Sequence, residues 1–372
     1  MKFINCSYEE FICNLGDKKI VLFGATSAWR YFSQLFPDID RDVLGHTLLV
    51  VDNDIEKQGR TFETDSGEFR IAAPVILNEL ENYVILITVS LAYQEEICRQ
   101  LLALNLQQDI ECFSLFLMSY ANREADNSAV DKYFADRKVK RIPPKIHSFW
   151  FSGEEKPDLY KRCVESWFKY CPTFEIIEWN SDNYDVTKNR YMFEAFEHQK
   201  WAFVSDYARL DVLNQEGGIY LDMDVELKVS LEPFLYADSF FCRQEDGLLE
   251  LGSGFGVQKN DPLIKSMLDA YGDRRLIMPN GEIDMTPQPI FVGSLLRENG
   301  FEKNHDSQVI AGRVVLSNDY ISCYSGPNAS IKAKVGIHWH NGGWLDEKSS
   351  NLIKKSNEVR ETIIEKYFYN NQ

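Results

Sequence analysis

The sequence predicts an α/β protein of two domains, the smaller one first. Three observations lead to this prediction. The chain has 372 residues, which is long for a single domain. Short runs of β-branched and aromatic residues alternate with amphipathic helical stretches, as in sheets flanked by helices. A charged linker that is poor in strand formers, residues 126–141, separates the two parts, and Pro143-Pro144 follows it closely.

The composition supports two cores and argues against several classes of protein. Hydrophobic residues make up 44% of the chain, and the formal net charge of −17 argues against nucleic-acid binding and broad membrane adhesion. Eight cysteines without a CxxC pair argue against a disulfide framework or a zinc site. No apolar run approaches the roughly 20 residues that cross a bilayer, and the N-terminus lacks the apolar core of a signal peptide. We therefore expect a cytoplasmic protein without a transmembrane segment.

The first domain, residues 1–125, is predicted to be a Rossmann-like sheet. Strands are expected near residues 18–23, 47–52, 83–89 and 110–113, with helices between them. Its first turn keeps only Gly24 of the G-x-G-x-x-G fingerprint that brings a backbone close to a pyrophosphate. Asp52 is placed to meet a ribose, but acids are common at strand ends. We interpret this domain as an accessory module for docking or homo-oligomerisation.

The second domain, residues 142–372, is organised around residues 201–227. Ser205 is a good helix N-cap, and it would place Asp206 in the first turn, where a negative charge is favoured. Gly217 and the glycine after it end this helix, since glycine tolerates the left-handed conformation that follows a helix. A β-type run comes next.

Acidic side chains gather at the end of this run. Alternate residues of a strand share one face, so Tyr220, Asp222 and, if the strand persists, Asp224 come together. Neighbouring carboxylates repel each other unless a cation lies between them, and oxygen ligands suit Mg²⁺ or Mn²⁺. Asp206 and Arg209 share a helix face and reach the same place. A solvated Asp-Met-Asp turn is the simpler interpretation of the triplet alone.

Other elements of the second domain are predicted from periodicity and breakers. The glycine-rich run at residues 252–256 is either a plain turn or a place where a sugar approaches the backbone. Strands are expected at residues 145–151, 174–179 and 239–243, and helices at 160–170, 262–270 and 346–368.

The pattern S-D-x-x-R at residues 205–209, followed by G-G-x-Y-x-D-x-D at residues 217–224, resembles glycosyltransferase family 32 and, more distantly, the glucosylating bacterial toxins. The resemblance also includes the segments at residues 142–151 and 336–344. It implies a GT-A fold and a retaining, metal-dependent enzyme that uses a nucleotide sugar. The family's Thr-Gly-Pro stretch departs here at Pro287-Gln288, which leaves the acceptor contacts open.

The resemblance also implies roles for single residues. Asp222 and Asp224 would act in catalysis and hold Mn²⁺ or Mg²⁺, with His338 as the third ligand, although His340 stays an alternative. Asp206 and Arg209 would hold sugar hydroxyls or the ribose.

A second set of residues would bind the donor, for which a UDP-sugar is favoured. Within it, one Trp stacks on the base and another covers the diphosphate. These residues are Trp150, Ser205, Tyr220 and Trp344, with Trp150 on the base and Trp344 on the diphosphate. The acceptor would be a glycan or lipid-linked glycan of a capsular or other surface polysaccharide, which would bring the protein to the inner face of the membrane.

Three alternatives stay open. A haloacid-dehalogenase-like phosphotransferase also has D-x-D after a strand, but its pattern wants Thr or Val where Glu226 stands. An NAD-dependent or nucleotide-sugar enzyme would work through the first domain. A non-catalytic glycan-binding or scaffold protein would keep the fold without turning over a donor.

Overall fold

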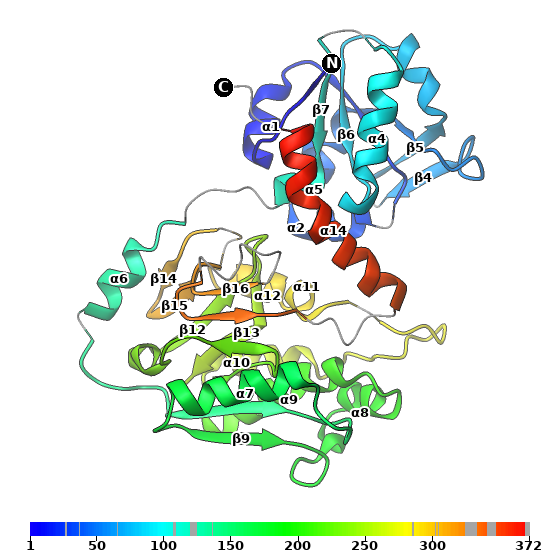
Figure 1. Cartoon of the computed structure of the whole chain (residues 1–372). Helices are drawn as coiled ribbons and strands as arrows, with labels where there is room; N and C mark the ends of the chain where they lie inside the picture. The colour runs from blue at the N-terminus through cyan, green and yellow to red at the C-terminus, as the bar shows by residue number, and fades with distance from the viewer. Residues whose placement is uncertain are drawn as a thin grey trace. The chain divides into compact units, whose positions relative to one another are not determined.

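The computed structural model describes residues 1–26, 28–36, 38–64, 66–106, 109–119, 125–135, 137–284, 286–301, 303, 305–323, 333–340 and 347–368. The chain divides into two compact units, each with sheets and helices (Figure 1). The first unit is Met1–Asn122 with Asp346–Gln372, and the second is Arg123–Leu345.

The first unit is built on a seven-stranded sheet in the order β1-β7-β6-β2-β3-β5-β4. Its pairs are parallel except for the edge hairpin of β4 and β5. All five residues of β6 are buried, as expected for a strand covered on both faces. The sequence did not predict β1 or the hairpin. The strands are β1 (Lys2–Phe3), β2 (Lys19–Phe23), β3 (Thr47–Val51), β4 (Thr61–Thr64), β5 (Gly67–Ala72), β6 (Tyr83–Ile87) and β7 (Glu111–Ser114). The helices are α1 (Tyr8–Leu15), α2 (Ala28–Leu35), α3 (Ile39–Asp42), η1 (Leu44–His46), η2 (Pro74–Glu79), α4 (Leu91–Ala103) and α5 (Leu115–Ser119).

The carboxylate of Asp52 is engaged within the protein. It accepts hydrogen bonds from the backbone N–H of Ala25 at 2.8 Å and of Asp54 at 2.9 Å, and Lys57 pairs with it at 3.2 Å. These bonds tie the turn after β2 to the end of β3. A strand-end carboxylate that already has these partners is a structural group, which weighs against a ribose contact at this position.

The C-terminal helix α14 (Glu347–Lys366) packs in the first unit, whereas the sequence analysis assigned it to the second domain. It lies along α4, where the hydroxyls of Ser356 and Ser90 are 2.8 Å apart. Ile363 and Phe368 join the apolar core of the first unit. The apolar stripe of an amphipathic helix shows that some core covers it but does not say which one.

The second unit contains a mixed seven-stranded sheet and a small three-stranded sheet, in the orders β14-β15-β12-β13-β10-β8-β9 and β11-β17-β16. The strands are β8 (Lys145–Phe149), β9 (Glu175–Trp179), β10 (Gly218–Tyr220), β11 (Val225–Leu227), β12 (Ser239–Arg243), β13 (Leu249–Val257), β14 (Gln308–Ile310), β15 (Arg313–Leu316), β16 (Ile321–Cys323) and β17 (Gly336–His338). The helices are α6 (Ser128–Ala135), α7 (Asp158–Tyr170), η3 (Val186–Lys188), α8 (Arg190–Glu197), α9 (Trp201–Glu216), η4 (Glu232–Tyr236), α10 (Pro262–Ala270), α11 (Gln288–Phe291) and α12 (Gly293–Glu298).

Strand β10 lies between the two apolar cores of the second unit. Tyr220 belongs to one core, and Ile219 and Leu221 belong to the other. Helix α9 packs in the first of these cores and α7 in the second, where the buried indole of Trp167 donates to the carbonyl of Val225 at 2.7 Å. The end of β10 is therefore held from both sides.

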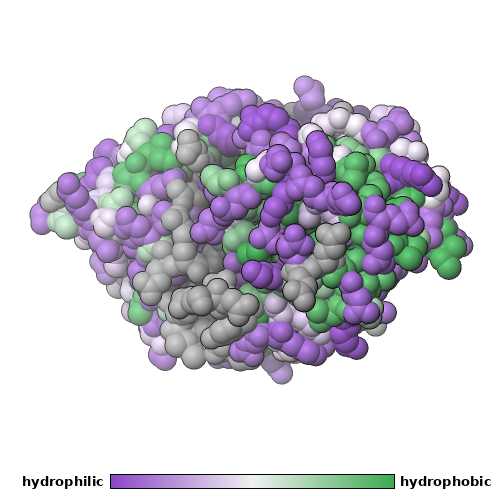
Figure 2. Space-filling view, turned by 90° about the horizontal axis from the view of Figure 1, so that it is seen from above, coloured by the Kyte–Doolittle hydropathy of each residue, from purple (hydrophilic) through white to green (hydrophobic). Residues whose placement is uncertain are grey.

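Hydrophilic side chains predominate on the face drawn in Figure 2, with smaller hydrophobic areas between them. No helix in the described ranges combines the length and the apolar character that would let it span a membrane.

Candidate active site

Helix α9 begins at Trp201, four residues before the predicted N-cap. Lys200 takes the N-cap position without a side-chain hydrogen bond. Phe203 and Val204 are buried in the core, and this tertiary packing favours an extra helical turn that local capping signals do not predict. The N-cap prediction was therefore wrong. The hydroxyl of Ser205 instead donates to the carbonyl of Trp201 at 3.1 Å, so Ser205 as a donor contact stays a prediction.

The strand before the acidic motif is shorter than predicted. Strand β10 ends at Tyr220, and Asp222 and Asp224 lie in the turn that leads to β11. The two carboxylates meet through this turn and not through strand alternation. His338 is brought next to these carboxylates by a strand pairing between distant parts of the chain. Strand β11 runs antiparallel to β17, with Val225 opposite His338.

Two carboxylates and one imidazole form the centre of the site. Nε2 of His338 lies 3.2 Å from Oδ1 of Asp224 and 3.7 Å from Oδ2 of Asp222. One ligand atom from each of these residues lies within 4.8 Å of the others. The side chain of Asp222 is 29% exposed, against 11% for Asp224 and 5% for His338, so the cluster is accessible on the Asp222 side.

A glycine gives this cluster its space. Gly252 lies in β13, not in the turn considered from the sequence, and its carbonyl accepts from the N–H of Asp222 at 3.1 Å. A Cβ at this position would stand 2.5 Å from Oδ2 of Asp222 and 3.3 Å from Cε1 of His338. Any other residue would push against the candidate ligands.

A buried arginine holds the open aspartate from the helix side. Arg209 lies 3.2 Å from Asp206 and 3.6 Å from Oδ1 of Asp222, and its guanidinium covers the ring of Tyr220 at 4.5 Å. The hydroxyl of Tyr220 donates to the same oxygen of Asp222. Oδ1 of Asp222 is thus engaged by the protein, while Oδ2 faces His338.

Burial and charge shift the ionisation of this site. Burial raises the pKa of Asp206 to about 6, although Arg209 opposes the rise. Burial alone would lower the pKa of His338, but the nearby Asp224 and Glu250 outweigh it and raise this pKa well above its ordinary value. The site therefore attracts positive charge, either as a proton or as a metal ion.

Beside Asp206 lies a group of buried polar atoms without a hydrogen-bond partner among the described residues. Gln288 donates to the carbonyl of Asp206 at 2.9 Å, but its own Oε1 has no donor. Arg274 stacks on Tyr191 at 4.4 Å and on Tyr271 at 5.4 Å, and neither its Nη1 nor the hydroxyl of Tyr191 has a partner among the described residues. Orphaned polar atoms in this number imply water or a polar ligand.

Two predicted donor residues remain, Trp150 and Trp344, and their roles stay predictions. The indole of Trp150 donates to the carbonyl of Glu154 at 2.7 Å and packs edge-on against Tyr160 at 5.4 Å. It lies at the end of β8, on the apolar core that also contains Trp167. Trp344 lies outside the described residues.

The sequence analysis missed two residues behind His338. Ser253 Oγ lies 3.0 Å from Nδ1 of His338, and Glu250 lies 3.5 Å from the same nitrogen. His340, left open as a ligand, lies 3.2 Å from Glu250. One feature of the sequence could have indicated Glu250: it is an acidic residue inside a strand whose other residues are apolar or small.

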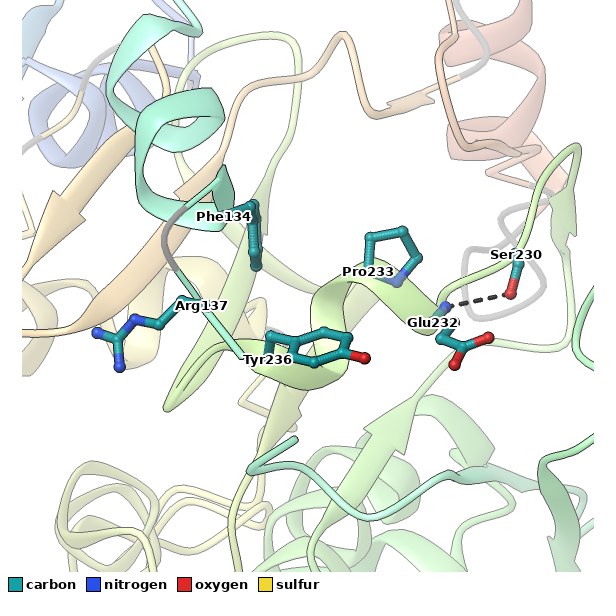
Figure 3. Close-up of a pocket in the computed structure, with 6 residues that line it drawn as sticks. All are labelled: Phe134, Arg137, Ser230, Glu232, Pro233 and Tyr236. Carbon is teal, nitrogen blue, oxygen red and sulfur yellow. Dashed lines mark hydrogen bonds between the residues drawn. The ribbon is translucent and has the colours of Figure 1, made fainter. Parts of the chain in front are cut away.

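A separate hollow of about 510 Å³ lies between α6 and η4 (Figure 3). It is lined by Phe134, Arg137, Ser230, Glu232, Pro233 and Tyr236. None of these residues belongs to the acidic cluster, so this hollow adds nothing to the chemistry described above.

Part of the second unit is similar to known glycosyltransferases. Residues 157–241 match the family described as "Glycosyltransferase sugar-binding region containing DXD motif". An uncharacterized glycosyltransferase, L373, of Acanthamoeba polyphaga mimivirus is 33% identical over 106 residues, which are 27% of this chain and 42% of that protein. Inositol phosphoceramide mannosyltransferase 1 of Schizosaccharomyces pombe is 19% identical over 254 residues, 64% of this chain and 74% of that protein. The chain thus spans less than half of the mimivirus relative.

Two solved structures show distant likeness. PaToxG glycosyltransferase has a TM-score of 0.33 and 17% identity, covering 46% of this chain and 77% of that one. A glycosyltransferase involved in glycosylation of the major capsid of PBCV-1 has a TM-score of 0.32 and 13% identity, covering 58% and 98%. These values are too low to support an argument. Residues 157–241 are thus similar to a glycosyltransferase sugar-binding region, and Asp222 and Asp224 both lie in this matched stretch.

Proposed function

We propose that this protein is a retaining, metal-dependent glycosyltransferase that moves a sugar from a nucleotide-diphosphate sugar, with a UDP-sugar favoured, to a glycan acceptor. The observation that carries the proposal is the convergence of Asp222, Asp224 and His338 at the end of β10, in a unit whose residues 157–241 match a DXD-containing sugar-binding region. We further propose a GT-A type fold for this unit, on the basis of its mixed sheet and the position of the motif at a strand end.

The residues present fit a divalent cation. Asp222 and Asp224 offer carboxylate oxygens and His338 an imidazole nitrogen, a mixed set that suits Mn²⁺ as well as Mg²⁺. Gly252 keeps free the space that a side chain would fill. A divalent ion bound there supplies Lewis-acid neutralisation of the charge that develops on the leaving diphosphate.

The protein's own side chains would prepare this site before the donor arrives. Tyr220 and Arg209 hold one oxygen of Asp222, which leaves the other directed at the cluster. Because Arg209 is itself buried and paired with Asp206, its position costs no rearrangement when the donor binds.

We place the donor sugar beside Asp206. Its carboxylate can accept from sugar hydroxyls, and the unpaired Nη1 of Arg274 and Oε1 of Gln288 lie in the same buried group. Sugar hydroxyls both donate and accept, so they suit a mixture of such atoms. Trp150 at the end of β8 is proposed to stack on the base and Trp344 to cover the diphosphate.

The acceptor is proposed to be a glycan or lipid-linked glycan of a surface polysaccharide, met at the inner face of the membrane. The fission-yeast relative is named for an acceptor that contains a lipid, which is consistent with this class. The first unit is proposed to serve docking or self-association.

The test is donor hydrolysis by the full chain with Mn²⁺ and a panel of UDP- and GDP-sugars. Asp224→Asn should abolish turnover while the unfolding transition in EDTA stays in place. Asp211→Asn, which changes a buried carboxylate of α9 that accepts from Tyr184, is the matched control and should keep turnover. Parent-like cleavage by Asp224→Asn would refute the role of the motif. Phosphate release from sugar phosphates without cleavage of nucleotide sugars would favour the phosphotransferase.

A further inference from the structure

The imidazole of His338 faces a different set of groups on each side. Its Nε2 faces Asp224 at 3.2 Å and Asp222 at 3.7 Å. Its Nδ1 faces Ser253 Oγ at 3.0 Å and Glu250 Oε2 at 3.5 Å. One nitrogen can therefore serve a cation only if the other carries the proton.

The hydrogen bonds behind the ring determine which nitrogen that is. Ser253 Oγ lies 2.6 Å from Oε2 of Glu250, and a carboxylate can only accept, so the serine hydroxyl donates to it. A hydroxyl oxygen that donates its hydrogen can still accept, so Nδ1–H of His338 donates to Ser253 Oγ. This chain of two hydrogen bonds leaves the Nε2 lone pair directed at the two aspartates.

The surroundings make this arrangement rigid. Ser253 is fully buried, and the side chains of His338 and Glu250 are 5% and 15% exposed. His340 Nε2 lies 3.2 Å from the same Oε2 of Glu250, and the two imidazole rings are 4.0 Å apart. Oε2 of Glu250 is thus contacted by Ser253 and by both histidines, and the burial of Ser253 and His338 keeps water from the bonds that orient His338.

We propose that Glu250, acting through Ser253, is a positioning residue that fixes the tautomer and orientation of His338 for the divalent ion. This inference rests on the proposed function. Groups that hydrogen-bond the far nitrogen of a metal-ligating histidine typically contribute about 10–100-fold to metal affinity. An alternative exists, because Glu250, His338 and His340 also bring ligand atoms within 4.8 Å of one another and form a second candidate cation site.

The experiment measures Mn²⁺ binding to the full chain without donor, by electron paramagnetic resonance of the free ion. We expect one ion per chain in the parent. Glu250→Ala should weaken binding about 10–100-fold, and Glu250→Gln, which keeps an acceptor for Ser253, should stay within about tenfold of the parent. Asp246→Asn, a buried carboxylate in the turn of the same hairpin, is the matched control and should bind as the parent does.

A second readout separates positioning from general damage. With Mg²⁺ bound, long-range ¹H–¹⁵N spectra should show His338 protonated at Nδ1 in the parent and as a mixture of tautomers in Glu250→Ala. Unchanged affinity and tautomer in Glu250→Ala would overturn the inference while leaving the proposed function intact. Two ions per parent chain, one of them lost in His340→Ala, would replace positioning by a second cation site. A parent that neither binds Mn²⁺ nor cleaves a donor would overturn the proposed function itself.

Discussion

Replacing Gly252 with alanine should disable the candidate ion site without unfolding the protein. The added Cβ would stand 2.5 Å from Oδ2 of Asp222, a separation that real atoms do not adopt. Asp222 must move, because the other neighbour, Cε1 of His338, is already at 3.3 Å. The carboxylate has little freedom, since Tyr220 and Arg209 hold its other oxygen. We therefore expect Oδ2 to turn away from the cluster.

The magnitude follows from losing one of three ligand groups. Affinity for Mn²⁺ should fall at least tenfold, which is about 1.4 kcal/mol. Overpacking costs about 1–3 kcal/mol, and replacing glycine within a strand returns about 0.5–1 kcal/mol. Gly252 does not have a positive φ, so alanine fits the backbone. The ion-free protein should lose no more than about 2.5 kcal/mol.

The assay is an Mn²⁺ titration followed by electron paramagnetic resonance, with thermal unfolding in EDTA to confirm the fold. Gly293→Ala is the matched control, because its Cβ would meet only Nη1 of Arg297 at an ordinary 3.4 Å. Parent-like Mn²⁺ affinity in Gly252→Ala would refute the reasoning, since the ion would then bind with a methyl group in the space beside Asp222.

Three further predictions concern stability. Burial lowers the pKa of His147 to about 4, so the unfolded chain takes up this proton near pH 6.5 but the folded chain only near pH 4. The neutral, buried His147 therefore stabilises the fold fully above pH 6.5. Below pH 6.5, down to about pH 4, the free energy of unfolding falls by about 1.4 kcal/mol per pH unit. His147→Asn should flatten this slope, as measured by urea unfolding. Arg209→Met should cost about 3–5 kcal/mol in the same assay, because it leaves the buried Asp206 without its nearest cation; a loss below 1 kcal/mol would show that Arg274 compensates. Phe368→Ala should destabilise the first unit by about 3–5 kcal/mol, since this fully buried ring packs 5.3 Å from Phe3; hydrogen exchange in α4 measures it, and unchanged protection there would contradict the placement of the C-terminal segment.

Local patterns predicted many of the elements near the site. The strand at residues 239–243 and the helix at residues 262–270 were predicted with the bounds that β12 and α10 have. Local signals are enough to predict such elements. The periodicity of apolar side chains and the missing N–H of proline both act within a few residues of the chain. The same local signals failed at α9, where buried Phe203 and Val204 extend the helix past a good capping residue.

The sequence by itself determined the acidic motif after an apolar strand, the two-part α/β organisation and a late histidine pair as candidate ligands. Only the tertiary structure decided that His338 faces Asp222 and Asp224, that His340 faces Glu250, and that α14 packs on α4. These contacts join residues that are far apart along the chain, and strand register and core packing set them. The register of β11 and β17 sets His338 opposite Val225 and so next to the aspartates, and no pattern of neighbouring residues carries that information.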